Sequence, residues 1–188
     1  MANKNTQGFG LVAAGTLGST PSTQGLGKYK IDAGYSTTIY NGGAVASSAG
    51  YIVEGQGSAA PVLGVLNGIF YNAATTLKPT WANFYKQPIT PANSEDIDAF
   101  VYDNPQQQYV VATDAAAAQA VFLETFDMNA SAGSDTTGKS SATLDIGTTG
   151  ADDKQFRLLR SAEDPENSDA TAGFASVVVV PNLIELQS

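Results

Sequence analysis

The sequence predicts an all-β protein, built as an antiparallel sandwich or barrel of the jelly-roll kind. Three observations lead to this prediction. Short runs of β-forming residues recur along the chain, and turns rich in Gly, Asn or Ser separate them. Residues 97–103 alternate between an inward set and an outward set, as half-buried strands do. No segment keeps a helical period over roughly 11 residues or more.

The predicted core centres on residues 61–72, which carry no charged side chain. Gly64 and Gly68 interrupt this apolar run as a bend or bulge would, so the stretch is expected to be buried β-structure. Residues 114–119 are the best helical stretch, with Asp114 as a candidate N-cap, but they last less than two turns. The remaining expected strands lie around Tyr29 and at 37–40, 44–48, 51–54, 107–113, 121–126, 143–146, 155–159 and 174–180.

Residues 1–27 are predicted to form an extended N-terminal arm in front of a single β domain, residues 28–188. The arm contains six glycines, and its one apolar island includes Phe9, Leu11 and Val12. Such a segment has too few apolar side chains to offset the entropy of ordering, so we expect it to be mobile in solution. Its apolar island is expected to become ordered on a partner; a frayed terminus is the alternative.

Composition excludes several classes of function. The charged fraction is 14%, against about 25% in an average protein, and small neutral polar residues fill the deficit. The net charge of −9 disfavours nucleic acid and anionic membranes as partners. The chain has no histidine and no cysteine, which excludes Ser-His-Asp and Cys-His catalysis and most zinc sites. No apolar run approaches the roughly 18 residues of a membrane helix.

Residues 133–140, GSDTTGKS, match the phosphate-loop pattern G-x-x-x-x-G-K-[ST] letter for letter. That pattern binds phosphate through backbone N–H groups and the N-terminus of a following helix. Here the following residues, SATLDIG, have β character, and Asp135 would place a negative charge among the phosphates. The motif is therefore predicted to be a hairpin loop, and no cofactor is expected.

Two other groups of residues could carry chemistry. Glu95, Asp96, Asp98 and Asp103 cluster in sequence, as do the acidic residues at 152–153 and 163–166, but solvated strand ends and loops explain them best. No catalytic or metal-ligating residue is predicted from them. Aromatic residues concentrate in the middle third of the chain, where most are expected to fill the core. Exposed rings among them would suit a carbohydrate-binding surface. The aromatic residues of the middle third are Tyr71, Trp81, Phe84, Tyr85, Phe100, Tyr102 and Tyr109.

The order of several segments resembles the capsid cement or decoration proteins of tailed bacteriophages, especially those of aquatic phages. The resemblance spans nearly the whole chain and consists of strand and turn patterns without a catalytic signature. The segments that carry it are NKNTQGFG, YKIDAGY, TTIYNG, LGVLNGIFYN, WANFYK, AFVYDNPQQQYVV, TGKSSATLDI and FASVVVVPNLIEL.

The resemblance implies a structural virion protein, not an enzyme, that binds the outside of an icosahedral capsid and bridges and stabilises neighbouring major capsid subunits. It implies synthesis in the host cytoplasm, a place on the outer capsid surface, and a symmetric homo-oligomer, either dimer or trimer. Phe9, Leu11 and Val12 are the expected capsid contacts. One alternative is a carbohydrate-binding or adhesion module on the virion or cell surface, which the aromatic residues support. Another is a glycoside hydrolase that uses carboxylates such as Glu95 and Asp98.

Overall fold

A computed structural model of the chain describes residues 3–18, 25–55, 57, 60–129, 133–150 and 152–186. These residues form eleven β-strands and three short 3-10 turns, with no α-helix among them. The strands are β1 (Val12–Thr16), β2 (Gly27–Ile31), β3 (Ala44–Ser48), β4 (Tyr51–Glu54), β5 (Gly64–Asn72), β6 (Pro79–Ala82), β7 (Ile97–Tyr102), β8 (Gln107–Ala112), β9 (Thr125–Phe126), β10 (Phe156–Ser161) and β11 (Ser176–Pro181). The turns are η1 (Ala92–Ser94), η2 (Gln119–Val121) and η3 (Ile146–Thr148). The all-β prediction is confirmed.

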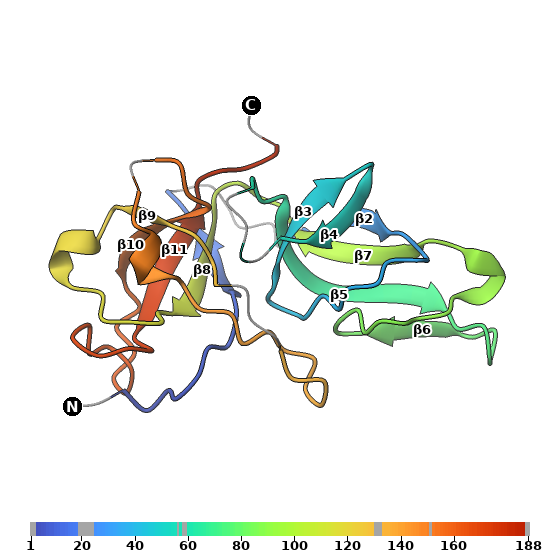
Figure 1. Ribbon diagram of the computed structural model, residues 1–188, viewed down its shortest axis with the longest axis horizontal. Coiled ribbons are helices and arrows are strands. Elements are labelled where there is room, and N and C mark those ends of the chain that lie inside the picture. Colours follow the sequence, from blue (N-terminus) through green and yellow to red (C-terminus); the bar gives the residue numbers. More distant parts are fainter. Residues whose placement is uncertain are drawn as a thin grey trace.

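The strands form two antiparallel sheets that pack together, consistent with a β-sandwich (Figure 1). The terminal sheet, on the left of Figure 1, has the order β1-β8-β11-β10-β9. The central sheet, on the right, has the order β2-β7-β5-β3-β4, and β6 pairs with β5. β5 pairs with β3 at its start and with β6 at its end. Its register against β7 shifts between Leu66 and Gly68, which confirms the irregularity expected from the glycines.

The apolar core consists of two clusters, one on each face of β3 and β5. Because side chains alternate along a strand, Val65 belongs to the first cluster and its neighbour Leu66 to the second. The first cluster lies against the terminal sheet and includes the buried rings of Tyr109, Phe126 and Phe156. The two sheets therefore pack where β3 and β5 are buried on both faces.

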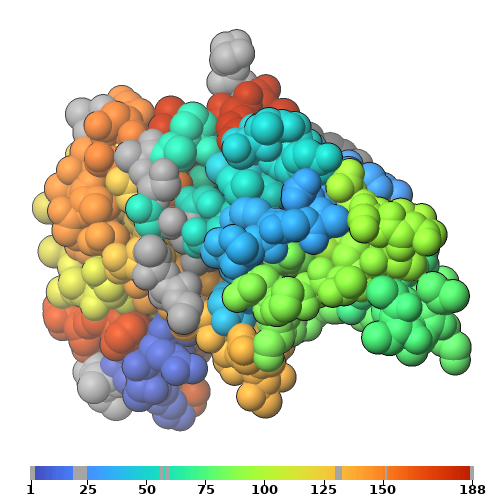
Figure 2. Space-filling view, turned by 45° about the vertical axis from the view of Figure 1, so that its right-hand side comes forward, coloured from blue at the N-terminus to red at the C-terminus, as the bar shows by residue number. Residues whose placement is uncertain are grey.

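The second cluster covers the opposite face of the central sheet. Ile39 and Tyr85 form an isolated bridge in the loops that close it, and both side chains are fully buried. Figure 2 shows these loop regions, in blue and yellow-green, on the near side of the lobe that the central sheet forms. The expected strand at 37–40 is thus mostly loop, and β6 ends at Ala82.

The helix expected at residues 114–119 does not form. The side chain of Asp114 does not cap a helix; it accepts hydrogen bonds from the backbone N–H of Ile146 at 2.9 Å and from Nδ2 of Asn129 at 3.2 Å. The stretch is too short to nucleate a helix by itself, so its weak helix propensity is outweighed by these long-range hydrogen bonds. A single 3-10 turn follows at Gln119–Val121.

The predicted N-terminal arm outside the core is wrong for residues 11–16. β1 pairs with β8 as an edge strand of the terminal sheet, and Leu11 is a member of the first core cluster. Ahead of it, Nδ2 of Asn3 donates to the carbonyl oxygens of Asp169 and Gly173 at 3.0 and 2.9 Å. The backbone N–H of Asn5 donates to Oδ1 of Asn167 at 2.7 Å. Hydrogen bonds of Asn3 and Asn5 therefore hold the start of the chain on the body of the protein, and burial of Leu11 adds to them.

Candidate functional site

One row of side chains crosses four strands of the central sheet. The directly paired residues in it are, in order, Trp81 of β6, Phe70 of β5, Asp98 of β7 and Lys30 of β2. Directly paired residues in an antiparallel sheet point to the same face. The neighbours of these residues along the chain point into the second core cluster, so the row points to the opposite face. Those neighbours include Ile31, Ile69 and Ala99.

Trp81 and Phe100 form an aromatic contact on this face, with ring centroids 5.3 Å apart and planes inclined at 44°. Phe100 is paired with Gly68, so no side chain stands between them. The indole of Trp81 occupies that space: a Cβ on Gly68 would lie 2.4 Å from its Cζ2 atom. Trp81 nevertheless remains 53% exposed and Phe70 36% exposed. We call the rings of Phe70, Trp81 and Phe100 the aromatic face.

Asp98 borders the aromatic face and binds two lysines. Its Oδ2 atom lies 2.8 Å from Nζ of Lys28, and its Oδ1 atom forms an ion pair with Nζ of Lys30 at 2.5 Å. Desolvation raises the pKa of Asp98, but the hydrogen bonds and charges of the two lysines together outweigh it and hold the pKa below its usual value. The hydrogen bond that Lys30 donates to Asp98 raises the pKa of Lys30. Asp98 is therefore a carboxylate at neutral pH.

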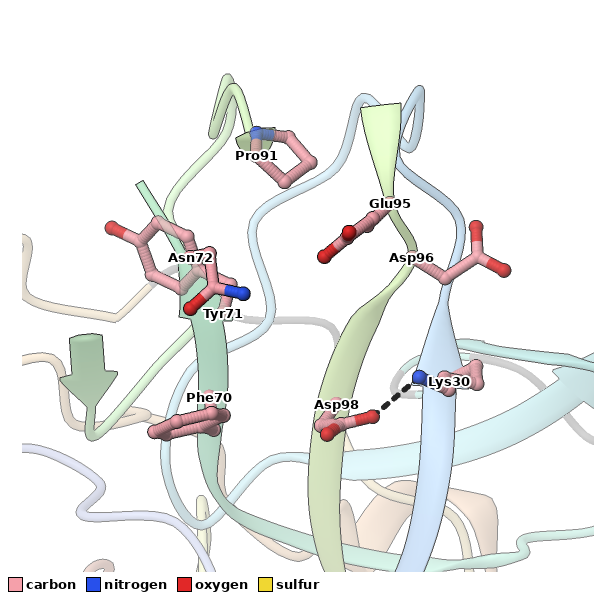
Figure 3. Close-up of a pocket in the computed structure, with 8 residues that line it drawn as sticks. All are labelled: Lys30, Phe70, Tyr71, Asn72, Pro91, Glu95, Asp96 and Asp98. Carbon is pink, nitrogen blue, oxygen red and sulfur yellow. Dashed lines mark ion pairs between the residues drawn. The ribbon is translucent and has the colours of Figure 1, made fainter. Parts of the chain in front are cut away.

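A hollow of ≈ 280 Å³ adjoins the aromatic face at Phe70. Figure 3 shows Glu95 pointing across it towards Tyr71 and Asn72, whereas Asp96 points away to the other side. Asp96 accepts a hydrogen bond of 3.2 Å from the hydroxyl of Tyr51. We call this feature the acidic hollow. It is lined by Lys30, Phe70, Tyr71, Asn72, Pro91, Glu95, Asp96 and Asp98.

The acidic hollow holds two of the carboxylates named above as candidates for glycoside hydrolysis. The structure does bring Glu95 and Asp98 to one hollow, as a glycoside hydrolase would require. Such a pair combines one ionised carboxylate with one carboxylic acid that donates a proton, and the lowered pKa of Asp98 excludes it from the proton-donor role only. Among the described residues, no group of three or more acidic side chains could hold a metal ion.

The other acidic clusters form local structural ties. Asp103 lies apart from the acidic hollow and accepts a hydrogen bond of 2.7 Å from the hydroxyl of Tyr29. Desolvation, and then this bond to Asp103, raise the pKa of Tyr29 to about 12. In the later loops, Asp152 pairs with Arg157 and Glu166 with Lys4. Exposed ion pairs of this kind contribute little to stability.

The phosphate-loop sequence at 133–140 forms a hairpin, as predicted. Gly133 and Ser140 are bridged, and the backbone N–H of Ser134 donates to the carbonyl oxygen of Lys139 at 2.9 Å. The next helical turn, η3, begins only at Ile146, so no helix N-terminus points at the loop. Asp135 instead accepts a hydrogen bond from the hydroxyl of Tyr40 at 2.8 Å and pairs with Lys86 at 2.9 Å.

The three expected capsid contacts are placed differently from one another. Leu11 is 3% exposed in the first core cluster, so its side chain cannot reach a partner. Phe9 is half-buried, and Val12, on the edge strand β1, is 51% exposed. Of the three, Val12 is the residue that presents an apolar side chain to solvent.

Sequence reasoning missed the aromatic face because it assigned most rings to the core. Of the seven aromatic residues singled out, Tyr85 and Tyr109 are fully buried. Trp81 is the most exposed aromatic residue among the described ones. The alternation at 97–103 did place Phe100 and Asp98 on one face, but the pairing of Phe70 with Trp81 depends on the sheet order.

No family model, curated protein or solved structure matches this chain significantly. Within the described residues, no helix is long and apolar enough to span a membrane.

Proposed function

We propose that this chain is a structural virion protein of a tailed bacteriophage. It binds the outside of the icosahedral capsid and bridges and stabilises neighbouring major capsid subunits. The segment order that resembles decoration proteins supports this proposal. So does a surface poor in charge, since charged residues are depleted at the cores of protein interfaces.

The observation that carries the proposal is the exposed edge at β1. β1 is the outermost strand of the terminal sheet, and its Val12 is 51% exposed. Leu17, directly after the strand, is 39% exposed. An edge strand can pair with a strand of another chain, and apolar side chains beside it add burial energy. Burying the exposed half of Val12 would contribute about 1 kcal/mol.

Bound copies per head provide the test. Undecorated capsids of the phage that encodes this chain are mixed with the wild type, with Val12→Asp, and with Leu77→Asp as control. Leu77 is 72% exposed in the turn between β5 and β6, so both variants introduce a charge at an exposed position. We expect Val12→Asp to lower occupancy and Leu77→Asp to leave it unchanged. Equal occupancy for all three proteins would contradict a β1 contact.

A symmetric homo-oligomer, dimer or trimer, is part of the proposal because capsid axes present repeated sites. Light scattering on the purified protein would give its mass. Location on the outer virion surface, after synthesis in the host cytoplasm, predicts that antibodies against the folded chain label intact heads. A carbohydrate-binding role is the second candidate, and the aromatic face beside the acidic hollow favours it.

A further inference from the structure

We infer that the aromatic face and the acidic hollow together form a glycan-binding site for neutral or amino sugars. This inference goes beyond attachment to the capsid, since the site lies on the central sheet and β1 lies in the terminal sheet. Ring geometry, the polar groups of the hollow and local charge support it.

The aromatic face offers flat rings in a preset orientation. Trp81 lies in the space left by Gly68 and is braced by Phe100, so little conformational entropy remains to be lost when a ligand stacks on it. Phe70, paired with Trp81, extends the apolar surface to the rim of the hollow. The C–H face of a pyranose ring is apolar and flat, so it can cover such rings while its hydroxyls point outward.

The acidic hollow supplies partners for sugar hydroxyls at the end of this surface. The carboxylate of Glu95, which points across the hollow, can accept hydrogen bonds, and the side-chain amide of Asn72 can donate and accept; Asp98, bound to its two lysines, adds negative charge. At ≈ 280 Å³ the hollow is close to the ~300 Å³ lower end of small-molecule pockets, which suits one sugar ring better than a helix or strand.

Charge selects among sugars. Among the described residues that line the acidic hollow, Lys30 is the one cation, against the carboxylates of Glu95, Asp96 and Asp98; Asp96 points away from the hollow, and Lys28, outside the lining, also pairs with Asp98. The net charge of the chain, −9, adds a repulsive field for anions. Uronic and sialic acids are therefore disfavoured. A protonated amino sugar gains both the carboxylates and a cation–π contact with the rings.

The same charges argue against a protein as occupant. Protein interfaces centre on desolvated apolar groups from which charged residues are depleted. Here the exposed ring of Phe70 is paired directly with Asp98, which binds two lysines, and Trp81 lies on the other side of Phe70. A glycan keeps these charges hydrated or hydrogen-bonded, whereas a protein interface would have to bury them.

Titration calorimetry with three defined probes tests the site: glucosamine oligomers, neutral cello-oligosaccharides and anionic alginate oligomers. We expect glucosamine oligomers to bind, with or without the cello-oligosaccharides. Alginate oligomers should not bind. Trp81→Ala should weaken binding about tenfold or more, because the main stacking surface is lost. Leu123→Ala, 62% exposed near the terminal sheet, is the matched control and should bind like the wild type.

Glu95→Gln, at an exposed position, is a second variant that does not touch the core. It should weaken glucosamine binding more than cello-oligosaccharide binding. The inference is overturned if the wild type binds none of the probes, if alginate binds as well as the others, or if Trp81→Ala binds unchanged. Capsid occupancy separates the two proposals: Trp81→Ala should decorate heads normally, and a loss there would make this face a protein interface instead.

Discussion

Gly68 leaves the space in which the indole of Trp81 lies. A Cβ at Gly68 would approach Cζ2 of Trp81 to 2.4 Å and Cη2 to 2.9 Å, closer than real atoms come. Because Gly68 has no side chain, the ring of Trp81 on the neighbouring strand can lie over it and reach Phe100. The same pairing explains why a glycine occupies the middle of the longest strand of the structure.

Gly68→Ala should push the indole off the sheet. Trp81 is the only tryptophan of the chain, so its fluorescence reports on this position alone. We expect the emission to shift to the red as the ring leaves Phe100 and becomes more hydrated, with only a modest loss of stability because the ring is already half exposed. Gly15→Ala is the control, since a Cβ there would meet nothing within 4 Å. An unchanged spectrum in Gly68→Ala would contradict the packing.

Asp98→Asn should make the free energy of unfolding depend less on pH in the acid range. The pKa of Asp98 is lower in the folded state, so its contribution is fully present above the usual Asp pKa of about 3.9 and is lost as pH falls through the folded-state pKa. At neutral pH the variant leaves Lys28 and Lys30 without their carboxylate, and because both lysines are about half exposed it should lose only about 1 kcal/mol. Urea unfolding between acid and neutral pH measures both effects. Asp153→Asn, at an exposed position, should keep the wild-type curve.

Thr113→Val should stabilise the protein. Thr113 is fully buried, and its hydroxyl has no hydrogen-bond partner among the described residues. A methyl group of similar shape would remove a desolvation cost of about 1 kcal/mol or more. Thr125→Val is the matched control, since that hydroxyl is equally buried but donates to the carbonyl oxygen of Gly150 at 2.8 Å. Thermal unfolding should show opposite shifts; a loss of stability in Thr113→Val would indicate an unseen partner.

Leu11→Ala and Val12→Ala should differ sharply although the residues are adjacent. Leu11 is 3% exposed in the core, so truncation should cost about 2–5 kcal/mol. Val12 is 51% exposed, and its truncation should change stability by less than about 0.5 kcal/mol. Denaturant unfolding compares the two variants. Equal, small losses would mean that residues 11–16 are a loose arm after all.

Lys139→Ala should be neutral and Gly138→Ala harmful, although both lie in the phosphate-loop sequence. Lys139 is exposed on the hairpin, so its loss should stay within about 0.5 kcal/mol. Gly138 has φ +69°, and a Cβ there would lie 2.3 Å from Cδ1 of Phe84. Thermal unfolding measures both variants. Nucleotide binding by the wild type that Lys139→Ala abolishes would overturn the hairpin interpretation.

The sequence by itself determined the class of the fold. Short β-forming runs, frequent turns and missing helical periods are local properties, so they predict an all-β chain without knowledge of which strands pair. The irregularity at Gly68, the hairpin at 133–140 and the inward set of residues 97–103 were predictable for the same reason. The absence of histidine and cysteine likewise excluded whole mechanisms from composition alone.

Only the tertiary structure decided where the exposed surfaces are. Leu11 and Val12 look alike in sequence, but pairing of β1 with β8 buries one and exposes the other. Trp81 looks like a core residue until β6 pairs with β5 and places its ring over Gly68 on the open face of the sheet. These outcomes depend on contacts between residues far apart in the chain, and side-chain hydrophobicity carries no information about which partner strand will be adjacent.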